Sequence, residues 1–374
     1  MNTQEIIKQY GKFVINTYTR APIVIVRGKG LKVWDLDGKE YLDFFPGWAV
    51  SGLGHCHPKV VNSVRHYLKK IIHVSNNFYN MLQGKLAQRI IENAYEGKVF
   101  FCNSGAEANE AAIKLVRAYG NKSARYEIIT MENSFHGRTL ATVTATGQVK
   151  YQKGFEPLPQ GFKIIPFNDI QAVEKAINDK TIAIMLELIQ GEGGINVASD
   201  DYISSLRKIC DERDLVLIFD EVQTGVGRTG KMFCFQHYGV EPDLMTLAKS
   251  LGGGLPIGAM VSSSKFQDVL KPGMHASTFG GSPIACSASL GVFSAIKKER
   301  LLSNTQKMGA YLANRLNELK DKKSVIKEIR GKGLMIGVEL TVEGKDIVEG
   351  CLKEGLLINC THGSVLRLMP GMIV

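Results

Sequence analysis

Short apolar runs alternate with longer amphipathic stretches from about residue 98 to residue 264. This alternation is typical of a mostly parallel sheet wrapped by helices, and it places the chain in the α/β class. The apolar runs predict strands over residues 98–102, 127–131, 163–167, 182–188, 216–219 and 259–262. Apolar residues at helical spacing predict helices over residues 106–118, 170–177 and 202–211.

The two ends of the chain have a different pattern. Residues 23–26 and 32–39 predict a hairpin with Asp37-Gly38 as its turn. From about Pro283 the pattern is helix, helix, strand and helix, with residues 331–340 as the clearest strand. We expect both ends to meet in a second, smaller domain. The predicted division is an N-terminal segment of that small domain (1–46), a large domain (47–275) and a C-terminal small-domain segment (276–374).

Composition and charge narrow the class of protein. The 374 residues are 44% hydrophobic, which is enough to bury a large core in two domains. The net charge of +10 is scattered along the chain, which favours anionic small molecules over nucleic acid as partners. Seven cysteines without a C-x-x-C pair indicate reduced thiols in the cytoplasm. The N-terminus does not resemble a signal peptide, and no apolar stretch approaches the length of a membrane span, so we expect no membrane association.

The most informative chemistry lies in residues 247–258, where Lys249 stands among apolar residues and glycines. Burial lowers the pKa of a lysine and leaves a nucleophilic amine, which suits a Schiff base with an aldehyde cofactor. Asp220 ends a buried apolar run, at the sheet edge where α/β proteins bind ligands, and it suits the protonated nitrogen of a pyridine ring. The pair favours pyridoxal phosphate.

Residues 103–112 follow a predicted strand and open a helix with the small residues Ser104, Gly105 and Ala106. Free backbone amides at the positive end of a helix dipole bind phosphate. An ordinary helix cap by Ser104 is the alternative. Together with Asp220 and Lys249, the phosphate interpretation is favoured.

Two other motifs are weaker. Residues 225–230 match G-x-G-x-x-G, but the preceding strand ends at Asp220 and no helix opens after the glycines, which disfavours dinucleotide binding. His55-Cys56-His57 offers metal-ligating side chains, yet no second cluster supplies further ligands, so we expect a structural loop and no metal.

Two loops carry candidate binding groups. Phe135 stands three residues before Arg138, so a ring that stacks on a flat cofactor and a guanidinium that binds a carboxylate share one loop. Glu192 lies in a glycine-rich turn after another strand. For Arg138 and Glu192, a role as ordinary surface charges is equally open.

The ordered set of residues 103–112, 135–139, 219–230 and 246–258 resembles the class III (subgroup II) aminotransferases, pyridoxal-phosphate enzymes of fold type I. The resemblance covers nearly the whole chain and is strongest to the acetylornithine aminotransferases. It implies a large domain with a seven-stranded, mostly parallel sheet flanked by helices, and a smaller α+β domain. It also implies ping-pong transfer of the terminal amino group of N2-acetylornithine to 2-oxoglutarate, in arginine biosynthesis.

The resemblance further implies a role for each matching residue. Lys249 corresponds to the Schiff-base lysine, Asp220 to the partner of the pyridine nitrogen and Gln223 to the neighbour of the phenolic oxygen. The remaining cofactor contacts are the two ring faces, Phe135 and Val222, and the phosphate loop, Ser104, Gly105 and Ala106. Thr278 corresponds to a threonine that reaches the phosphate from the other subunit, which implies a homodimer.

The implied substrate residues are Arg138, which grips the α-carboxylate of the donor, with Tyr18 and Ser277 beside it. Glu192 and Arg367 resemble a switch pair: the glutamate neutralises the arginine for the donor and frees it for 2-oxoglutarate. The chain ends seven residues after Arg367, where relatives usually continue into another helix, so we expect a shortened small domain.

Alternative functions stay open at the level of sequence. Related aminotransferases that act on succinyl-diaminopimelate, ornithine or 4-aminobutyrate share the same catalytic set, as does an aminomutase. Trp48 stands in a segment where ornithine aminotransferases have a tyrosine, which weighs against free ornithine. A pyridoxal-phosphate-binding relative without catalysis is the alternative from another class.

Overall fold

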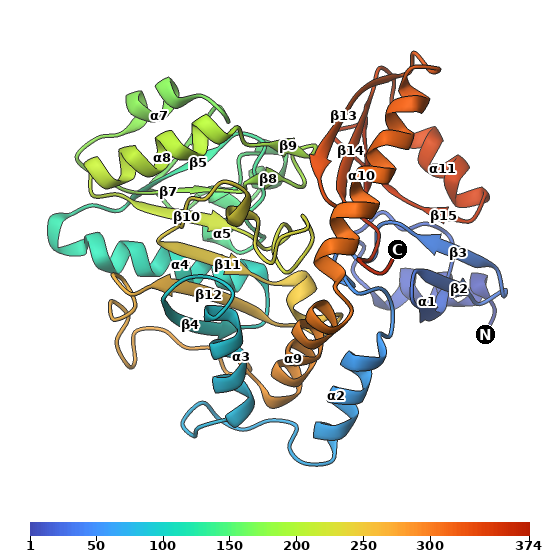
Figure 1. Ribbon diagram of the computed structural model, residues 1–374, viewed down its shortest axis with the longest axis horizontal. Coiled ribbons are helices and arrows are strands. Elements are labelled where there is room, and N and C mark those ends of the chain that lie inside the picture. Colours follow the sequence, from blue (N-terminus) through green and yellow to red (C-terminus); the bar gives the residue numbers. More distant parts are fainter.

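A seven-stranded sheet forms the centre of the computed structural model, which describes residues 1–374 (Figure 1). Its strand order is β4-β12-β11-β10-β7-β5-β6. The strands are β4 (Gly97–Cys102), β5 (Glu127–Met131), β6 (Phe162–Ile165), β7 (Thr181–Leu186), β10 (Val216–Asp220), β11 (Leu244–Leu247) and β12 (Gly258–Ser263). Only β12 runs antiparallel to its neighbours, β4 and β11. The predicted mostly parallel α/β sheet is therefore confirmed.

Both faces of this sheet are buried, which explains the continuous apolar runs in its strands. Along β10, Leu217 and Phe219 enter one core cluster, whereas Val216 and Ile218 enter the cluster on the opposite face. The helices of this part of the molecule are α2 (Pro58–Leu68), α3 (Met81–Ile91), α4 (Gly105–Gly120), α5 (Leu140–Ala145), α6 (Val149–Gln152), α7 (Ile170–Ala176), α8 (Asp200–Glu212) and α9 (Pro283–Lys298). Short 3-10 turns are η1 (Asn121–Ser123), η2 (Cys234–His237) and η3 (Lys249–Gly252), and β8 (Ile189–Gln190) pairs with β9 (Asn196–Val197).

Two four-stranded sheets and three helices make up the rest of the chain, on the right of Figure 1. One sheet has the order β1-β2-β3-β15 and the other the order β13-β14-β17-β16. Their strands are β1 (Ile25–Lys29), β2 (Lys32–Asp35), β3 (Glu40–Asp43), β13 (Ile326–Lys332), β14 (Met335–Leu340), β15 (Leu356–Leu357), β16 (Asn359–Thr361) and β17 (Val365–Leu368). The helices are α1 (Thr3–Phe13), α10 (Leu301–Lys320) and α11 (Lys345–Lys353).

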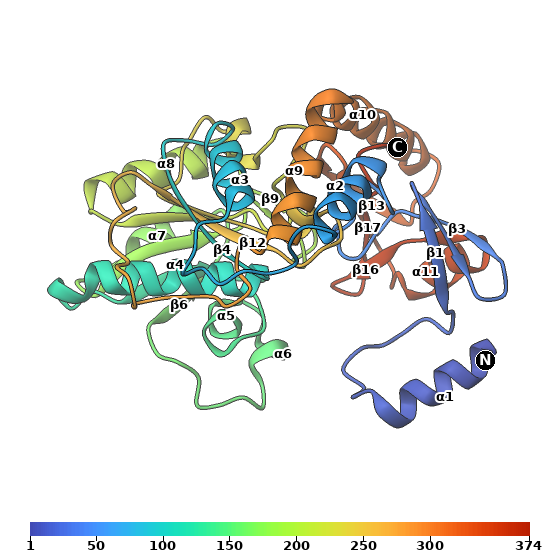
Figure 2. The same ribbon diagram turned by 90° about the horizontal axis from the view of Figure 1, so that it is seen from below.

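The two ends of the chain share a sheet, because β15 pairs in parallel with β3. Figure 2 shows α1 set apart from this sheet, joined to it by an extended segment. The domain boundaries after residues 46 and 275 stay predictions. None of the helices combines the length and the apolar composition that a bilayer crossing requires.

Three details of the sequence-based assignment were wrong. The hairpin of β1 and β2 turns at Gly30, where the backbone is left-handed, whereas Asp37-Gly38 lies in the next connection, between β2 and β3. The predicted strand over residues 331–340 is the end of β13, a reversal at Gly333 and then β14. The short strand β11 was not predicted, because Thr246 interrupts its apolar residues.

Candidate active site

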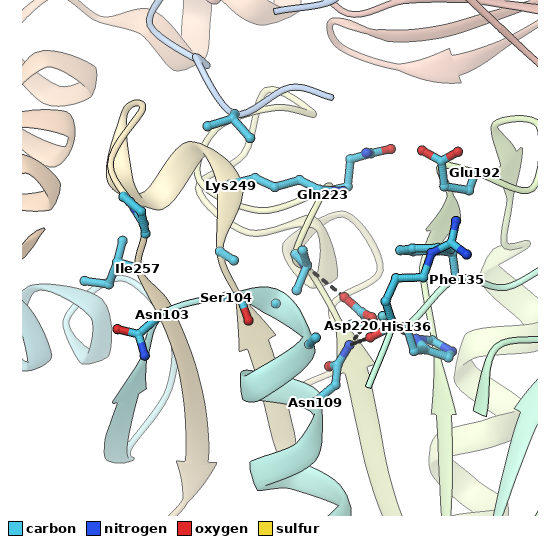
Figure 3. A pocket seen from close by; sticks show the side chains of 18 of the residues that line it. Asn103, Ser104, Asn109, Phe135, His136, Glu192, Asp220, Gln223, Lys249 and Ile257 are labelled. Atoms are coloured by element: carbon cyan, nitrogen blue, oxygen red, sulfur yellow. Dashed lines mark hydrogen bonds and ion pairs between the residues drawn. The ribbon is translucent and has the colours of Figure 1, made fainter. Parts of the chain in front are cut away.

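A pocket of about 440 Å³ opens at the edge of the central sheet where the parallel strands end, the place where α/β proteins bind their ligands (Figure 3). Asp220 ends β10, and Lys249 follows β11 after one intervening residue. The predicted site residues that line this pocket are Ser104, Gly105, Ala106, Phe135, Arg138, Glu192, Asp220, Val222, Gln223 and Lys249. Residues far apart in the sequence therefore meet as the motifs predict.

Four predicted site residues lie outside the pocket lining. Arg367 stands behind the lining residue Glu192, to which it is ion-paired. Tyr18 is exposed, and its ring centroid lies 6.4 Å from that of Trp48. Ser277 accepts a hydrogen bond from the Asn103 side chain, and the neighbouring Thr278 is exposed in an adjacent hollow. One chain alone therefore does not bring Tyr18, Ser277 and Thr278 into its own pocket.

The Asp220 carboxylate is buried at the floor of the pocket, 3% exposed, and is held by three donors (Figure 3). Its Oδ1 accepts from the backbone N–H of Val222 at 3.0 Å. Its Oδ2 accepts from the Asn109 amide and from Nδ1 of His136, each at 2.8 Å. The Thr246 hydroxyl donates to Oδ1 of Asn109 at 2.7 Å, which fixes the orientation of that amide. Because buried carboxylates need such partners, this network sets where the negative charge lies.

The Lys249 amine has neither a hydrogen bond nor an ion pair within the chain. Burial lowers the pKa of Lys249, and the attraction of Glu192 and Asp220 offsets only part of that effect. Its backbone is left-handed, with φ of 46°, in a residue type for which that conformation is strained. A strained lysine with a lowered pKa has the properties of a nucleophile or a general base.

The start of α4 forms the phosphate-binding candidate. Ser104 caps the helix by accepting a hydrogen bond from the backbone N–H of Glu107, and the first helical amides have no partner within the helix. A Cβ on Gly105 would lie 2.7 Å from the Val222 side chain, so glycine allows the close approach of these two segments. The helix dipole adds positive potential at this point.

These groups fit pyridoxal phosphate. The buried Oε1 of Gln223 and Nε2 of His136 have no partner within the chain. The Asp220 carboxylate suits a pyridinium nitrogen, the start of α4 suits a phosphate, and the lowered pKa of Lys249 suits attack on an aldehyde. The donor set thus matches each functional group of that cofactor.

The switch-pair candidates, Glu192 and Arg367, form an ion pair that is largely buried. Nη1 of Arg367 lies 2.7 Å from Oε1 of Glu192, and the Arg367 side chain is 1% exposed. Arg367 also donates to the carbonyl of Gly191 and to the side chain of Asn359. The backbone of the glycine-rich turn is held in addition by Thr361, which donates to the Glu192 carbonyl, and by Arg330, which donates to the Gly194 carbonyl. The backbone of the turn is therefore held by contacts that do not involve the Glu192 side chain.

Among the pocket residues that the sequence analysis did not assign, Asn109, His136 and Glu187 hold other groups of the site. Asn109 and His136 hold Asp220, and both lie inside motifs that were assigned to the phosphate and to ring stacking. Glu187 accepts from the backbone N–H groups of Phe135 and Gly191 at 2.9 and 3.1 Å, and so joins two loops of the pocket. Burial raises the pKa of Glu187 to about 7. A polar residue at the end of an apolar run is the signal that could have identified Glu187.

Residues of the two weaker motifs make structural contacts, most of them with distant parts of the chain. In the glycine-rich stretch 225–230, the buried Arg228 donates to the carbonyls of Leu334 and Pro370. His55 contacts Asp43 at 2.8 Å, and His57 caps α2 and contacts Glu299 at 3.2 Å. Each side chain thus has a partner within the fold.

Comparisons with known proteins agree with this geometry. The sequence profile of the family described as "Aminotransferase class-III" matches residues 14–374. The acetylornithine aminotransferase of Caldanaerobacter subterraneus subsp. tengcongensis is 54% identical over 97% of this chain and 93% of that protein. Among solved structures, an ornithine aminotransferase of Toxoplasma gondii with partial occupancy of PLP at its active site is 34% identical, with a TM-score of 0.95 over 100% of this chain and 90% of that one. The acetylornithine aminotransferase of Elizabethkingia anophelis is 32% identical, with a TM-score of 0.89 over 100% and 95% of the two chains.

The buried Glu221 beside Asp220 predicts a pH dependence of stability. Burial raises the pKa of Glu221 to about 7, although the backbone N–H groups of Cys234 and Phe235 donate to it at 2.6 and 2.7 Å. In the unfolded chain, Glu221 has its ordinary, lower pKa. The stabilisation that protonated Glu221 gives the folded state is therefore fully present below about pH 4.5 and is lost as pH rises through 7. The loss is about 3 kcal/mol for one group with such a shift.

Urea unfolding between pH 5 and 8 measures how steeply the free energy of unfolding falls as pH rises. We expect Glu221→Gln to flatten this slope, and the exposed Glu349→Gln to leave it unchanged. Equal slopes in wild type and Glu221→Gln, compared in the same cofactor state, would contradict the assignment.

Proposed function

Because the chain belongs to the class-III aminotransferases, which are pyridoxal-phosphate-dependent transaminases of fold type I, we propose that it moves the terminal amino group of N2-acetylornithine to 2-oxoglutarate. The products are N-acetylglutamate 5-semialdehyde and glutamate, and the pathway is arginine biosynthesis. The relatives at about half identity that bear the name acetylornithine aminotransferase support this donor.

The single observation that carries the proposal is the ion pair between Glu192 and Arg367 at the pocket edge. With Arg367 neutralised, Arg138 is the one guanidinium of the pocket without a carboxylate partner, which matches a donor with one carboxylate. 2-Oxoglutarate has two carboxylates and requires a second cation, which Arg367 provides once Glu192 moves aside. One pocket thereby takes two differently charged partners.

We assign the cofactor contacts by the same logic. Asp220 would hold the ring nitrogen, Phe135 and Val222 the ring faces, and Gln223 the phenolic oxygen. The phosphate would lie on Ser104, Gly105 and Ala106, with Tyr18 and Ser277 near the substrate. When bound, pyridoxal phosphate supplies an aldehyde that takes up the amino group and a ring that withdraws electrons from the reacting carbon.

Lys249 is the proposed proton carrier. Its lowered pKa makes the neutral amine more accessible than in a free lysine, so Nζ can accept a proton from the substrate carbon and would deliver it to the cofactor carbon that receives the amino group. Asp220 keeps a negative charge at the floor of the pocket, fixed by Asn109 and His136. These residues favour a catalyst over a silent binding protein, since binding alone requires no base.

We also propose that the enzyme is a cytoplasmic homodimer. All seven cysteines are free, as in a reducing compartment. Asn76 donates to the carbonyls of Ser277 and Gly280, so two segments with exposed aromatic rings lie together. These rings belong to Phe78, Tyr79 and Phe279. An exposed apolar patch of this kind suits a second copy, whose Thr278 would then complete the phosphate site.

A donor panel tests the proposed reaction. With 2-oxoglutarate as acceptor, we expect kcat/KM to be highest for N2-acetylornithine among acetylornithine, succinyl-diaminopimelate, ornithine and 4-aminobutyrate. Loss of the cofactor's yellow absorbance on adding donor alone reports the first half-reaction. A higher kcat/KM for any of the other three would assign the enzyme to that donor.

Glu192→Gln tests the switch pair. Without Glu192, the buried Arg367 keeps an unpaired charge while the donor is bound, so we expect KM for N2-acetylornithine to rise about ten-fold. The KM for 2-oxoglutarate and the kcat should change far less. Steady-state kinetics with each substrate varied in turn gives these values, and equal effects on both substrates would refute the pairing.

Sedimentation velocity tests the assembly. We expect a dimer in wild type, and weaker pyridoxal-phosphate affinity in Thr278→Ala without loss of the dimer. A fully active monomer would contradict the proposed role of the second subunit.

A further inference from the structure

Tyr151 of α6 lies just outside the pocket lining, in contact with two residues that line it. The guanidinium carbon of Arg138 lies 3.9 Å from the centroid of the Tyr151 ring, and 5.3 Å from that of the Phe135 ring. Tyr151 meets Phe135 edge-on, with 5.7 Å between centroids and 88° between planes. The Tyr151 ring is thus the closest support of the Arg138 guanidinium.

Apart from these aromatic rings, no group of the chain holds the Arg138 guanidinium in place. Its side chain is exposed and makes no hydrogen bond or ion pair within the chain. A long exposed arginine samples many rotamers, and ordering it lowers the affinity for any carboxylate that it binds. Contact with aromatic rings is the interaction available to restrict it.

An aromatic ring restricts an arginine in a way that a carboxylate does not. Stacking uses the face of the guanidinium and leaves its in-plane N–H groups free for bidentate binding of a ligand. The positive charge of the guanidinium also stays available, because an aromatic ring does not neutralise it as a carboxylate does. Arg367 differs from Arg138 in this respect: its guanidinium carbon also lies over an aromatic ring, 4.7 Å from the centroid of Phe45, but Glu192 and Asn359 occupy its donors.

We infer that Tyr151 is a positioning residue that orients Arg138 toward the α-carboxylate of the donor and so sets the preference for carboxylate-bearing amines. The inference rests on the proposed function, in which Arg138 binds that carboxylate. The phenolic hydroxyl of Tyr151 makes no hydrogen bond within the chain, so the ring alone performs this role.

The test compares two donors that differ by one carboxylate, N2-acetylornithine and N-acetylputrescine, in the holoenzyme. For Tyr151→Leu we expect KM for N2-acetylornithine to rise about two- to five-fold. The kcat for this donor, and both constants for N-acetylputrescine, should stay at the wild-type values. Tyr151→Phe should restore the affinity for N2-acetylornithine because it restores the ring.

A double-mutant cycle tests the same role of Tyr151 even if the enzyme does not turn over N-acetylputrescine. In an Arg138→Met background, Tyr151→Leu should cause no further rise in KM. Calorimetric titration of the holoenzyme with N2-acetylnorvaline, which keeps the carboxylate but lacks the amine, should show the same two- to five-fold loss without turnover.

Several outcomes would overturn the inference. Additive effects of the two substitutions would separate Tyr151 from Arg138. An equal fall of kcat with both donors would mean that Tyr151 supports only Phe135. If wild type prefers ornithine, the proposed donor fails, and the same comparison with ornithine and putrescine still decides the role of Tyr151.

Discussion

The burial of one negative charge at the end of β10 is the constraint on which the site depends. Asp220 stands where the fully buried strand β10 meets the pocket, and its carboxylate keeps its place through Val222, Asn109 and His136. Each of these donors comes from a different loop or helix, so the network ties together the segments that follow β4, β5 and β10. The fold and the electrostatics of the pocket are therefore set by the same hydrogen bonds.

The three basic side chains of the site each have a distinct environment. Lys249 lines the pocket and has a pKa lowered by burial, whereas Arg367 is buried but paired with Glu192. Arg138 is exposed and supported by aromatic faces. In the proposed function, these three basic side chains therefore bind different groups: Lys249 suits an aldehyde, Arg367 a carboxylate only after Glu192 leaves, and Arg138 a carboxylate directly.

The sequence predicted the central sheet well because its strands are buried on both faces and have unbroken apolar runs. Lys249, Asp220 and the start of α4 were also brought together as their motifs indicate, since each lies at or just after the end of a strand of this sheet. Asn109 and Thr246 were missed because neither carries recognisable chemistry, and their importance follows from contacts 111 and 137 residues apart in sequence. Tyr18 and Thr278 lie outside the pocket of a single chain, so their predicted roles depend on surroundings that one chain does not supply.

The covalent attachment of the cofactor tests the central claim most directly. Reduction of the pyridoxal-phosphate-loaded protein with borohydride, followed by peptide mapping, should place the label on Lys249 alone. A label on another lysine, or no label in a protein that holds the cofactor, would contradict the account.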